Sequence, residues 1–177
     1  MFKRTYGFTI VELLIVIVVI GILAAISIVA YNSISNNAND SSVKSDLRNI
    51  SQQMELAKVE GPTGQYPTGN AGAFSYEVLG AKVNRSAYAT SPDLTINLLM
   101  CRDVASSKFS ILATSKSGKR FYTINGGGVF EYVGSTPWNT DLPNDHCRSV
   151  DAGIGYAGGS GYNSSSVVGG WRPWAAG

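Results

Sequence analysis

The first third of the chain almost lacks the residues that interrupt helices and that keep a segment in water. Residues 8–58 contain no proline and one glycine, Gly21, and residues 7–31 contain a single charged side chain, Glu12. The scarcity of both helix breakers excludes turns from this region. An uncharged apolar run of this length is typical of a membrane-spanning helix, which needs about 20 residues.

Cysteine, histidine and net charge are also scarce. The 177 residues include two cysteines, Cys101 and Cys147, and one histidine, His146. Setting aside Lys3 and Arg4 leaves 12 of the 14 basic residues against 12 acidic ones, which excludes a global attraction to nucleic acid or anionic lipid. No nucleophile motif such as G-x-S-x-G accompanies the lone histidine, so we expect neither enzyme activity nor a cofactor.

The few early charges predict which side of the membrane the chain lies on. Lys3 and Arg4 precede the apolar run, and no basic residue follows it until Lys44, so the N-terminus is expected in the cytoplasm and the chain after Tyr31 outside. The run is too long for an ordinary signal peptide and lacks an obvious cleavage site after it. An oxidising exterior favours a disulfide between the two cysteines, the alternative being two free buried thiols.

Apolar periodicity predicts that the helix continues beyond the apolar run. One face repeats at spacings of four, three, four and three residues, through Val43, Leu47, Ile50, Met54 and Ala57. The polar stretch before this face either continues the helix or interrupts it. An unbroken helix from Phe8 to Lys58 would be roughly 75 Å long, and Gly61-Pro62 ends it.

The second half of the chain predicts an antiparallel sheet, so the fold class is α+β. The expected strands are residues 93–101, 108–115, 120–125 and 129–133, joined by turns at 115–119 and 126–128. The amphipathic helix face is expected to cover this meander. Residues 61–86 are predicted as loop with a short helix near 76–79, and the chain after Pro137 as irregular.

Glu12 is costly inside an apolar run, because a carboxylate at bilayer depth costs about 2.5–3.5 kcal/mol. A cut after Gly7 would make Phe8 a new amino terminus, which is positively charged near neutral pH and lies one helical turn from Glu12. The carboxylate would then pair with its own amine or with that of a neighbouring chain. Pairing with a neighbouring chain would also explain why subunits assemble. An unassembled subunit would carry a poorly matched charge, and side-by-side packing would relieve it.

The segment "KRTYGFTIVELLIVIVVIGILAAI" closely resembles the N-terminus of type IV pilins, including the pseudopilins of type II secretion and the competence pilins. The resemblance implies that a prepilin peptidase cleaves between Gly7 and Phe8 and methylates the new N-terminus. It also implies that Glu12, with Thr9 beside it, directs assembly. Many major pilins have a proline in the second half of the apolar run, whereas residues 22–31 of this chain contain none. It is therefore open whether this helix loosens in a filament, as such helices do in the family.

These features predict five segments: a leader (1–7), a transmembrane and filament-core helix (8–31), its amphipathic continuation (32–60), a globular head (61–150) and a tail rich in glycine, serine and aromatics (151–177). The expected function is that of a structural subunit of a type IV pilus, and the sequence leaves open whether the pilus serves adhesion, twitching motility or DNA uptake. The alternatives are a type II secretion pseudopilin and a membrane-tethered extracellular domain that does not polymerise.

The expected partners are further copies of the chain and other pilins in a helical filament, the prepilin peptidase, the inner-membrane assembly machinery and the membrane. The precursor is expected in the cell membrane with its N-terminus in the cytoplasm, and the mature chain in an extracellular filament.

Three other groups of residues are weaker candidates. The segment around the C-terminal cysteine holds oxygen-bearing side chains that can bind calcium, but a solvated loop is favoured and no metal is expected. The segment contains Asp141, Asn144, Asp145, Asp151 and the histidine His146. A cationic turn formed by Lys116, Lys119 and Arg120 could contact DNA, but an ordinary solvated turn is favoured. The tail aromatics are expected to cover the sheet rather than form an adhesive surface; they are Tyr156, Tyr162, Trp171 and Trp174.

Overall fold

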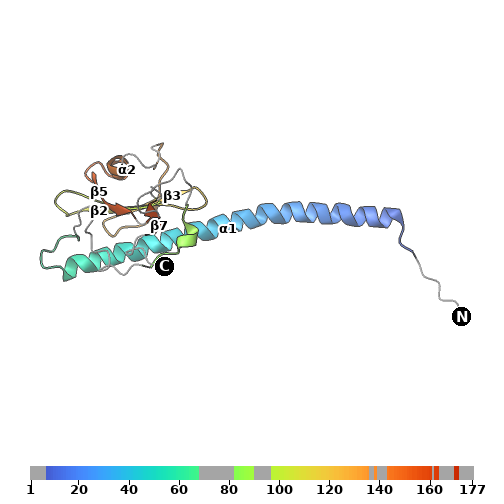
Figure 1. The fold of residues 1–177 in the computed structure, drawn as a ribbon, viewed down its shortest axis with the longest axis horizontal. Coiled ribbons are helices and arrows are strands. Elements are labelled where there is room, and N and C mark those ends of the chain that lie inside the picture. Colours follow the sequence, from blue (N-terminus) through green and yellow to red (C-terminus); the bar gives the residue numbers. More distant parts are fainter. Residues whose placement is uncertain are drawn as a thin grey trace. The chain divides into compact units, whose positions relative to one another are not determined.

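The described residues form a long helix, a five-stranded antiparallel sheet, a second helix and a separate two-stranded pair (Figure 1). The computed structural model describes residues 7–67, 82–89, 97–135, 138, 143–160, 162–163 and 170–171; of residues 143–144, 156–160, 162–163 and 170–171 it describes the backbone alone. The chain divides into two compact units, Met1–Asn36 and Asn37–Gly177. The α+β prediction is confirmed.

Helix α1 runs without interruption from Ile10 to Glu60, over 51 residues. The polar stretch between the apolar run and the amphipathic face is therefore helical, although its serines and asparagines are weak helix formers. The helix ends where the sequence predicts. The Gly61 N–H donates to the carbonyl of Ala57 at 3.0 Å, and turns follow up to Pro67.

The C-terminal half of α1 buries the predicted apolar face. Val43, Leu47, Ile50 and Met54 are at most 1% exposed. They pack against side chains from one face of the sheet, namely Leu98, Met100, Phe109, Ile111, Ala113 and Phe121. This contact forms the larger of the two hydrophobic cores and confirms that the amphipathic face covers the sheet.

Four consecutive strands form the predicted meander. They are β1 (Leu98–Arg102), β2 (Phe109–Thr114), β3 (Arg120–Ile124) and β4 (Phe130–Glu131). Each pairs antiparallel with the next, so that Met100 lies opposite Ile111 and Ile111 opposite Thr123. The turn after β3 needs Gly126, which has a φ of +70°. Strand β1 begins at Leu98, and the predicted residues 93–96 lie outside the described part of the chain.

The prediction that the chain is irregular after Pro137 is wrong. Residues Pro143–Val150 form helix α2, and Tyr156–Ser160 form strand β5 at the edge of the sheet beside β1. The order of the sheet is β4-β3-β2-β1-β5. The sequence "YAGGS" has little intrinsic strand preference, and pairing with β1 decides its conformation. Strands β6 (Tyr162–Asn163) and β7 (Gly170–Trp171) pair separately.

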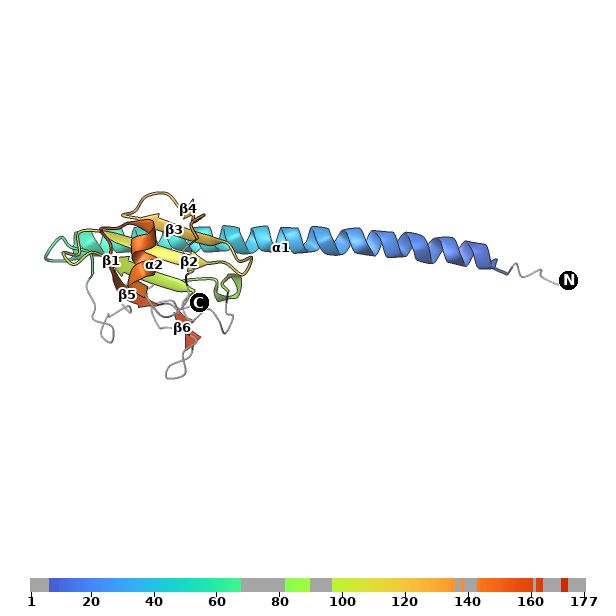
Figure 2. The same ribbon diagram turned by 90° about the horizontal axis from the view of Figure 1, so that it is seen from above.

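Helix α2 covers the sheet face opposite α1, so the head has three layers (Figures 1 and 2). A second core lies beneath α2, made of Leu99, Cys101, Leu112, Trp138, Cys147 and Ile154. Alternate residues of the strands thus serve two cores, as the side-chain alternation of a strand requires.

A buried carboxylate ties the described part of the loop before β1 to α1. Asp46 Oδ2 accepts hydrogen bonds from the Asn84 N–H at 2.8 Å and the Tyr88 hydroxyl at 3.1 Å. These partners flank the short 3₁₀ helix η2 (Arg85–Ala87). Burial raises the pKa of Asp46, and the two hydrogen bonds oppose this shift. The helix predicted near residues 76–79 lies outside the described residues.

Candidate functional site

The start of α1 brings Thr9 and Glu12 together. The Thr9 N–H and hydroxyl both donate to Glu12 Oε2, at 2.8 and 2.7 Å, and the Glu12 N–H donates to Thr9 Oγ1 at 3.2 Å. Thr9 immediately precedes the helix and Glu12 is its third residue. This is the reciprocal T-x-x-E capping box, which satisfies amide groups that the first helical turn leaves unpaired.

The capping box gives Glu12 a role that the sequence analysis did not recognise. The T-x-x-E spacing is itself a sequence signal for a helix start. Both side chains remain exposed to solvent in the isolated chain. The carboxylate is therefore hydrogen-bonded before any cleavage, but no cation lies against it among the interactions of the described residues. One carboxylate oxygen, Oε2, accepts two hydrogen bonds, and the charge is not neutralised by a cation among the described residues.

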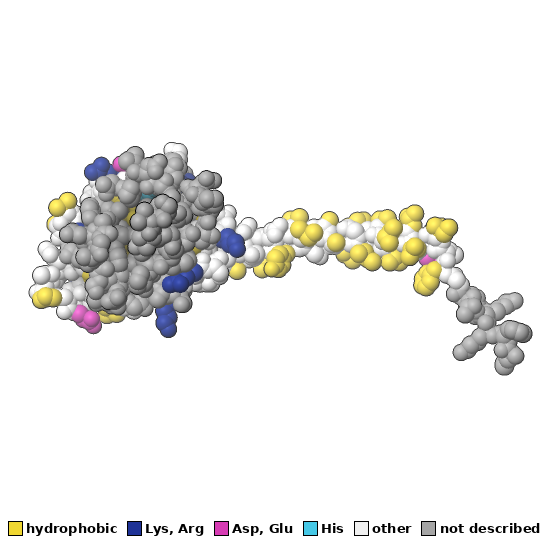
Figure 3. All heavy atoms as spheres, viewed as in Figure 1, with side chains coloured by type: hydrophobic (Ala, Val, Ile, Leu, Met, Phe, Trp, Pro, Cys, Tyr) yellow, Lys and Arg dark blue, Asp and Glu magenta, His cyan; other side chains and the backbone are white. Residues whose placement is uncertain are grey.

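The apolar segment that follows Glu12 has no partner in the described chain. Between Leu13 and Tyr31 its large side chains are between 48% exposed, at Val19, and 72% exposed, at Tyr31. Figure 3 shows these hydrophobic side chains along the first half of α1. An 18-residue window of this helix has a mean hydropathy of 3.3 with none of it buried, so by length and composition it can span a membrane. A helix that is apolar on all sides requires lipid or other helices around it.

Two glycines, Gly7 and Gly21, belong to this N-terminal region. A Cβ added at either position would meet nothing within 4 Å, and neither residue has a positive φ. Neither space nor backbone conformation within the described chain therefore requires glycine at position 7.

Residues 2–28 match the family model described as the prokaryotic N-terminal methylation motif. The chain carries a prepilin-type N-terminus. This motif is the class III signal peptide of type IV pilins, and it supports a type IV pilin-like or pseudopilin precursor that is anchored in the membrane. It implies processing by prepilin peptidase and assembly into pilus-like filaments, and proteins of this type are usually structural. No curated protein and no solved structure matches the chain.

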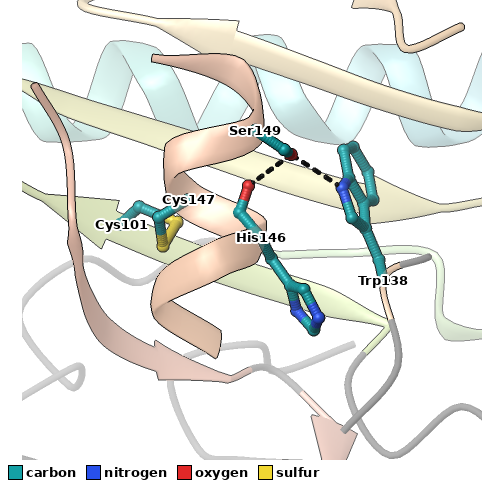
Figure 4. The surroundings of a disulfide bond; sticks show 5 residues. All are labelled: Cys101, Trp138, His146, Cys147 and Ser149. Carbon is teal, nitrogen blue, oxygen red and sulfur yellow. Dashed lines mark hydrogen bonds between the residues drawn. A yellow bond between two sulfur atoms is a disulfide. The ribbon is translucent and has the colours of Figure 1, made fainter. Parts of the chain in front are cut away.

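The two cysteines are joined in the disulfide that the sequence favoured. Cys101 of β1 and Cys147 of α2 have Cα atoms 5.6 Å apart, and both side chains are fully buried. Figure 4 shows the bond between the helix and the strand beneath it. On the other side of α2, the Trp138 indole N–H donates to the Ser149 hydroxyl at 3.2 Å, and that hydroxyl donates to the His146 carbonyl at 2.6 Å.

The acidic segment around Cys147 does not assemble as a metal centre in the described chain. Asp145 is exposed on α2, His146 is 3% exposed, and Asp151 accepts the Gly153 N–H at 2.8 Å. No group of three metal-ligating side chains occurs among the described residues. Asp141 and the side chain of Asn144 lie outside them.

The cationic turn is engaged in local contacts. Lys119 lies 4.0 Å from Asp40 and 3.4 Å from Glu131. The Arg120 guanidinium lies 4.9 Å from the centre of the Tyr132 ring and donates to the Gly134 carbonyl at 3.0 Å. These contacts favour a structural role for two of the three cations predicted as a DNA-contacting group.

The tail aromatics cannot be assigned to either predicted role. The backbones at Tyr156, Tyr162 and Trp171 lie in short strands, but their side chains and all of Trp174 are outside the described residues. Coverage of the sheet by these aromatics therefore stays a prediction.

Proposed function

We propose that this chain is a structural subunit of a type IV pilus, made as a membrane-anchored precursor and polymerised through residues 8–31. The observation that carries the proposal is the apolar half of α1, which lacks any partner among the described residues and has the capped Glu12 in its first turn. Lipid can surround this helix before assembly, and the same helices of other subunits can surround it afterwards. The mature chain then lies in an extracellular filament.

In this proposal Glu12 has one role in the precursor and another in the cleaved subunit. In the precursor, the capping box with Thr9 gives Oε2 of the carboxylate two hydrogen bonds without supplying a positive charge. Cleavage between Gly7 and Phe8 would create an amine within one helical turn. Pairing of Glu12 with the amine of a neighbouring subunit would neutralise a charge that is costly in lipid, and would thereby favour assembly.

The proposed cleavage also accounts for Gly7. Since neither packing nor φ requires a glycine there, its value is expected to lie in recognition by the prepilin peptidase. The test is N-terminal sequencing and mass spectrometry of the chain recovered from cells that have a prepilin peptidase. We expect the sequence to begin at methylated Phe8. A surface chain that still begins at Met1 would refute the proposal.

Gly21 offers a matched control for this test, because it is equally free of neighbouring atoms. Gly7→Val is expected to leave the precursor uncleaved, whereas Gly21→Val is expected to be processed normally. Equal processing of both variants would show that cleavage does not require glycine at position 7.

A pseudopilin of a type II secretion system is the second candidate, because the methylation motif fits both kinds of protein. The disulfide and the long C-terminal tail favour a pilus subunit. Electron microscopy of filaments sheared from cells, with mass spectrometry of their subunits, separates the two. Recovery of this chain as a filament component supports the pilus, and its absence from surface filaments together with a defect in secretion supports the pseudopilin. A tethered domain that never polymerises would need neither Glu12 nor the Gly7–Phe8 junction.

A further inference from the structure

A small cavity with both polar and apolar lining lies between α2 and the sheet face that α2 covers, apart from the N-terminal site. It is lined by Asn97, Leu99, Leu112, Thr114, Trp138 and His146, with about 10 Å³ available to the centre of a water molecule. Its three polar side chains are nearly closed off from bulk solvent: Asn97 is 1%, His146 3% and Thr114 4% exposed. A space of this size holds one water molecule when it also offers polar partners.

Two oxygen atoms of these lining residues have no hydrogen-bond partner within the described chain. They are Asn97 Oδ1 and Thr114 Oγ1. The amide of Asn97 cannot be reversed to satisfy its oxygen, because its Nδ2 already donates to the Ala89 carbonyl at 2.7 Å. Leaving a buried acceptor without a donor is costly, so both oxygens need a hydrogen-bond partner that the described residues do not supply.

We propose that this cavity is a binding site for a single internal water molecule, held by Asn97, Thr114 and His146. The water donates to Asn97 Oδ1, and it shares further hydrogen bonds with the Thr114 hydroxyl and the His146 imidazole. Three partners are the usual number for a buried water. One water thus satisfies both unpartnered oxygens.

The position of the site gives the water a structural role. Asn97 and Thr114 lie opposite each other at one end of the β1–β2 pair, where the Thr114 N–H donates to the Asn97 carbonyl at 2.9 Å. His146 comes from α2, and Figure 4 shows its side chain pointing away from the disulfide. The water therefore joins α2 to the sheet at a second place, next to the covalent attachment through Cys101 and Cys147.

A structure of the full chain, purified in detergent, at a resolution that reveals ordered water tests the site directly. We expect one solvent peak in the cavity, within hydrogen-bond distance of Asn97 Oδ1 and Thr114 Oγ1. A dry cavity, or direct protein donors to these two oxygens, would overturn the proposal.

A double-mutant cycle on the full chain tests the shared partner independently. Thr114→Val and His146→Phe each remove one hydrogen-bonding group from the water, so the drop in Tm of the double mutant should be smaller than the sum of the two single drops. Ser110→Ala is the matched control, since Ser110 lies on the same strand with a buried, unpartnered hydroxyl but does not line the cavity. Its effect should add to that of His146→Phe. Additive effects in both pairs would contradict a shared water.

Discussion

The two halves of α1 are one continuous helix with opposite surroundings. Around Leu14 the large side chains are exposed on every side, whereas Leu47 is fully buried against the sheet. The same secondary structure therefore serves two purposes. The C-terminal half is stabilised by its own fold, and the N-terminal half is left for an environment outside the chain. Substitutions matched between the two halves can break or sharpen this contrast.

Leucine-to-alanine changes in the two halves are expected to give the largest difference. Leu47→Ala removes a fully buried side chain and should lower the free energy of unfolding of the head by about 2–5 kcal/mol. Leu14→Ala removes an exposed side chain, 55% accessible, and should leave that quantity unchanged. Chemical denaturation of the full chain in detergent, followed by tryptophan fluorescence, measures both. Equal losses of stability would show that the N-terminal half also packs on its own chain.

Removal of the disulfide should have the next largest effect, confined to the C-terminal unit. The bond closes a loop between residues 46 positions apart, and loss of a native disulfide typically costs about 2–5 kcal/mol. Cys147→Ser should therefore increase protease cleavage after Pro137 while membrane insertion stays normal. Limited proteolysis under oxidising and reducing conditions measures this change. Equal cleavage patterns for the variant and the oxidised parent chain would mean that other contacts alone hold α2.

The contrast along α1 was predictable because it depends on periodicity. The apolar run and the spacing from Val43 to Met54 indicate two helix environments, and the strands alternate regularly enough to predict a meander. Helix α2 and strand β5 were missed, because an eight-residue helix is too short and too polar to stand out in the sequence, and "YAGGS" lacks the apolar alternation of a strand. Their conformations depend on Cys101 and β1, which are distant in sequence.

Polar contacts between distant residues were the least predictable part. Asp46 interrupts an apolar face, and nothing in the sequence near it points to Tyr88, 42 residues away. His146 was assigned to a candidate calcium loop, whereas its side chain is buried under α2. The capping box of Thr9 and Glu12 is local and follows a known spacing, so it could have been read from the sequence.

The capping and assembly roles of Glu12 can be separated at a smaller energetic scale. Loss of an N-cap side chain costs about 1 kcal/mol, and substitutions of Glu12 should cost less because the Thr9 hydroxyl still accepts from the N–H of residue 12. Glu12→Gln keeps an oxygen that can accept from the Thr9 N–H, whereas Glu12→Ala does not. If the charge directs assembly, both variants should insert normally and yield few filaments. The yield of sheared filaments, with the variant as the sole copy of the subunit, measures this effect. A normal filament yield from Glu12→Gln with a low yield from Glu12→Ala would assign the assembly role to the capping box. A normal yield from Glu12→Ala would show that neither the charge nor the cap at Glu12 directs assembly.

The smallest expected effect is a dependence of head stability on pH that originates at Asp46. Burial raises its pKa in the folded chain above the ordinary value of 3.8. Between these two pKa values the folded state binds more protons than the unfolded state, so the contribution of Asp46 to stability falls as pH rises through this window. Asp46→Asn carries no charge and keeps an oxygen that can accept from Asn84 and Tyr88, so this decline should disappear.

Asp103 supplies a control of opposite sign in the same unit. Desolvation raises its pKa, but hydrogen bonds from the Ser107 hydroxyl and from the N–H groups of Lys108 and Ser107 outweigh it, so its pKa is lowered. The contribution of Asp103 is present above pH 3.8 and is lost as pH falls through its folded-state pKa. Denaturation of the full chain between about pH 3 and 7 should therefore show that Asp46→Asn removes a decline toward higher pH and Asp103→Asn a decline toward lower pH. Parallel pH profiles for the parent chain and Asp46→Asn would mean that water reaches the Asp46 carboxylate, and that the contact between α1 and the loop at Tyr88 is open in solution.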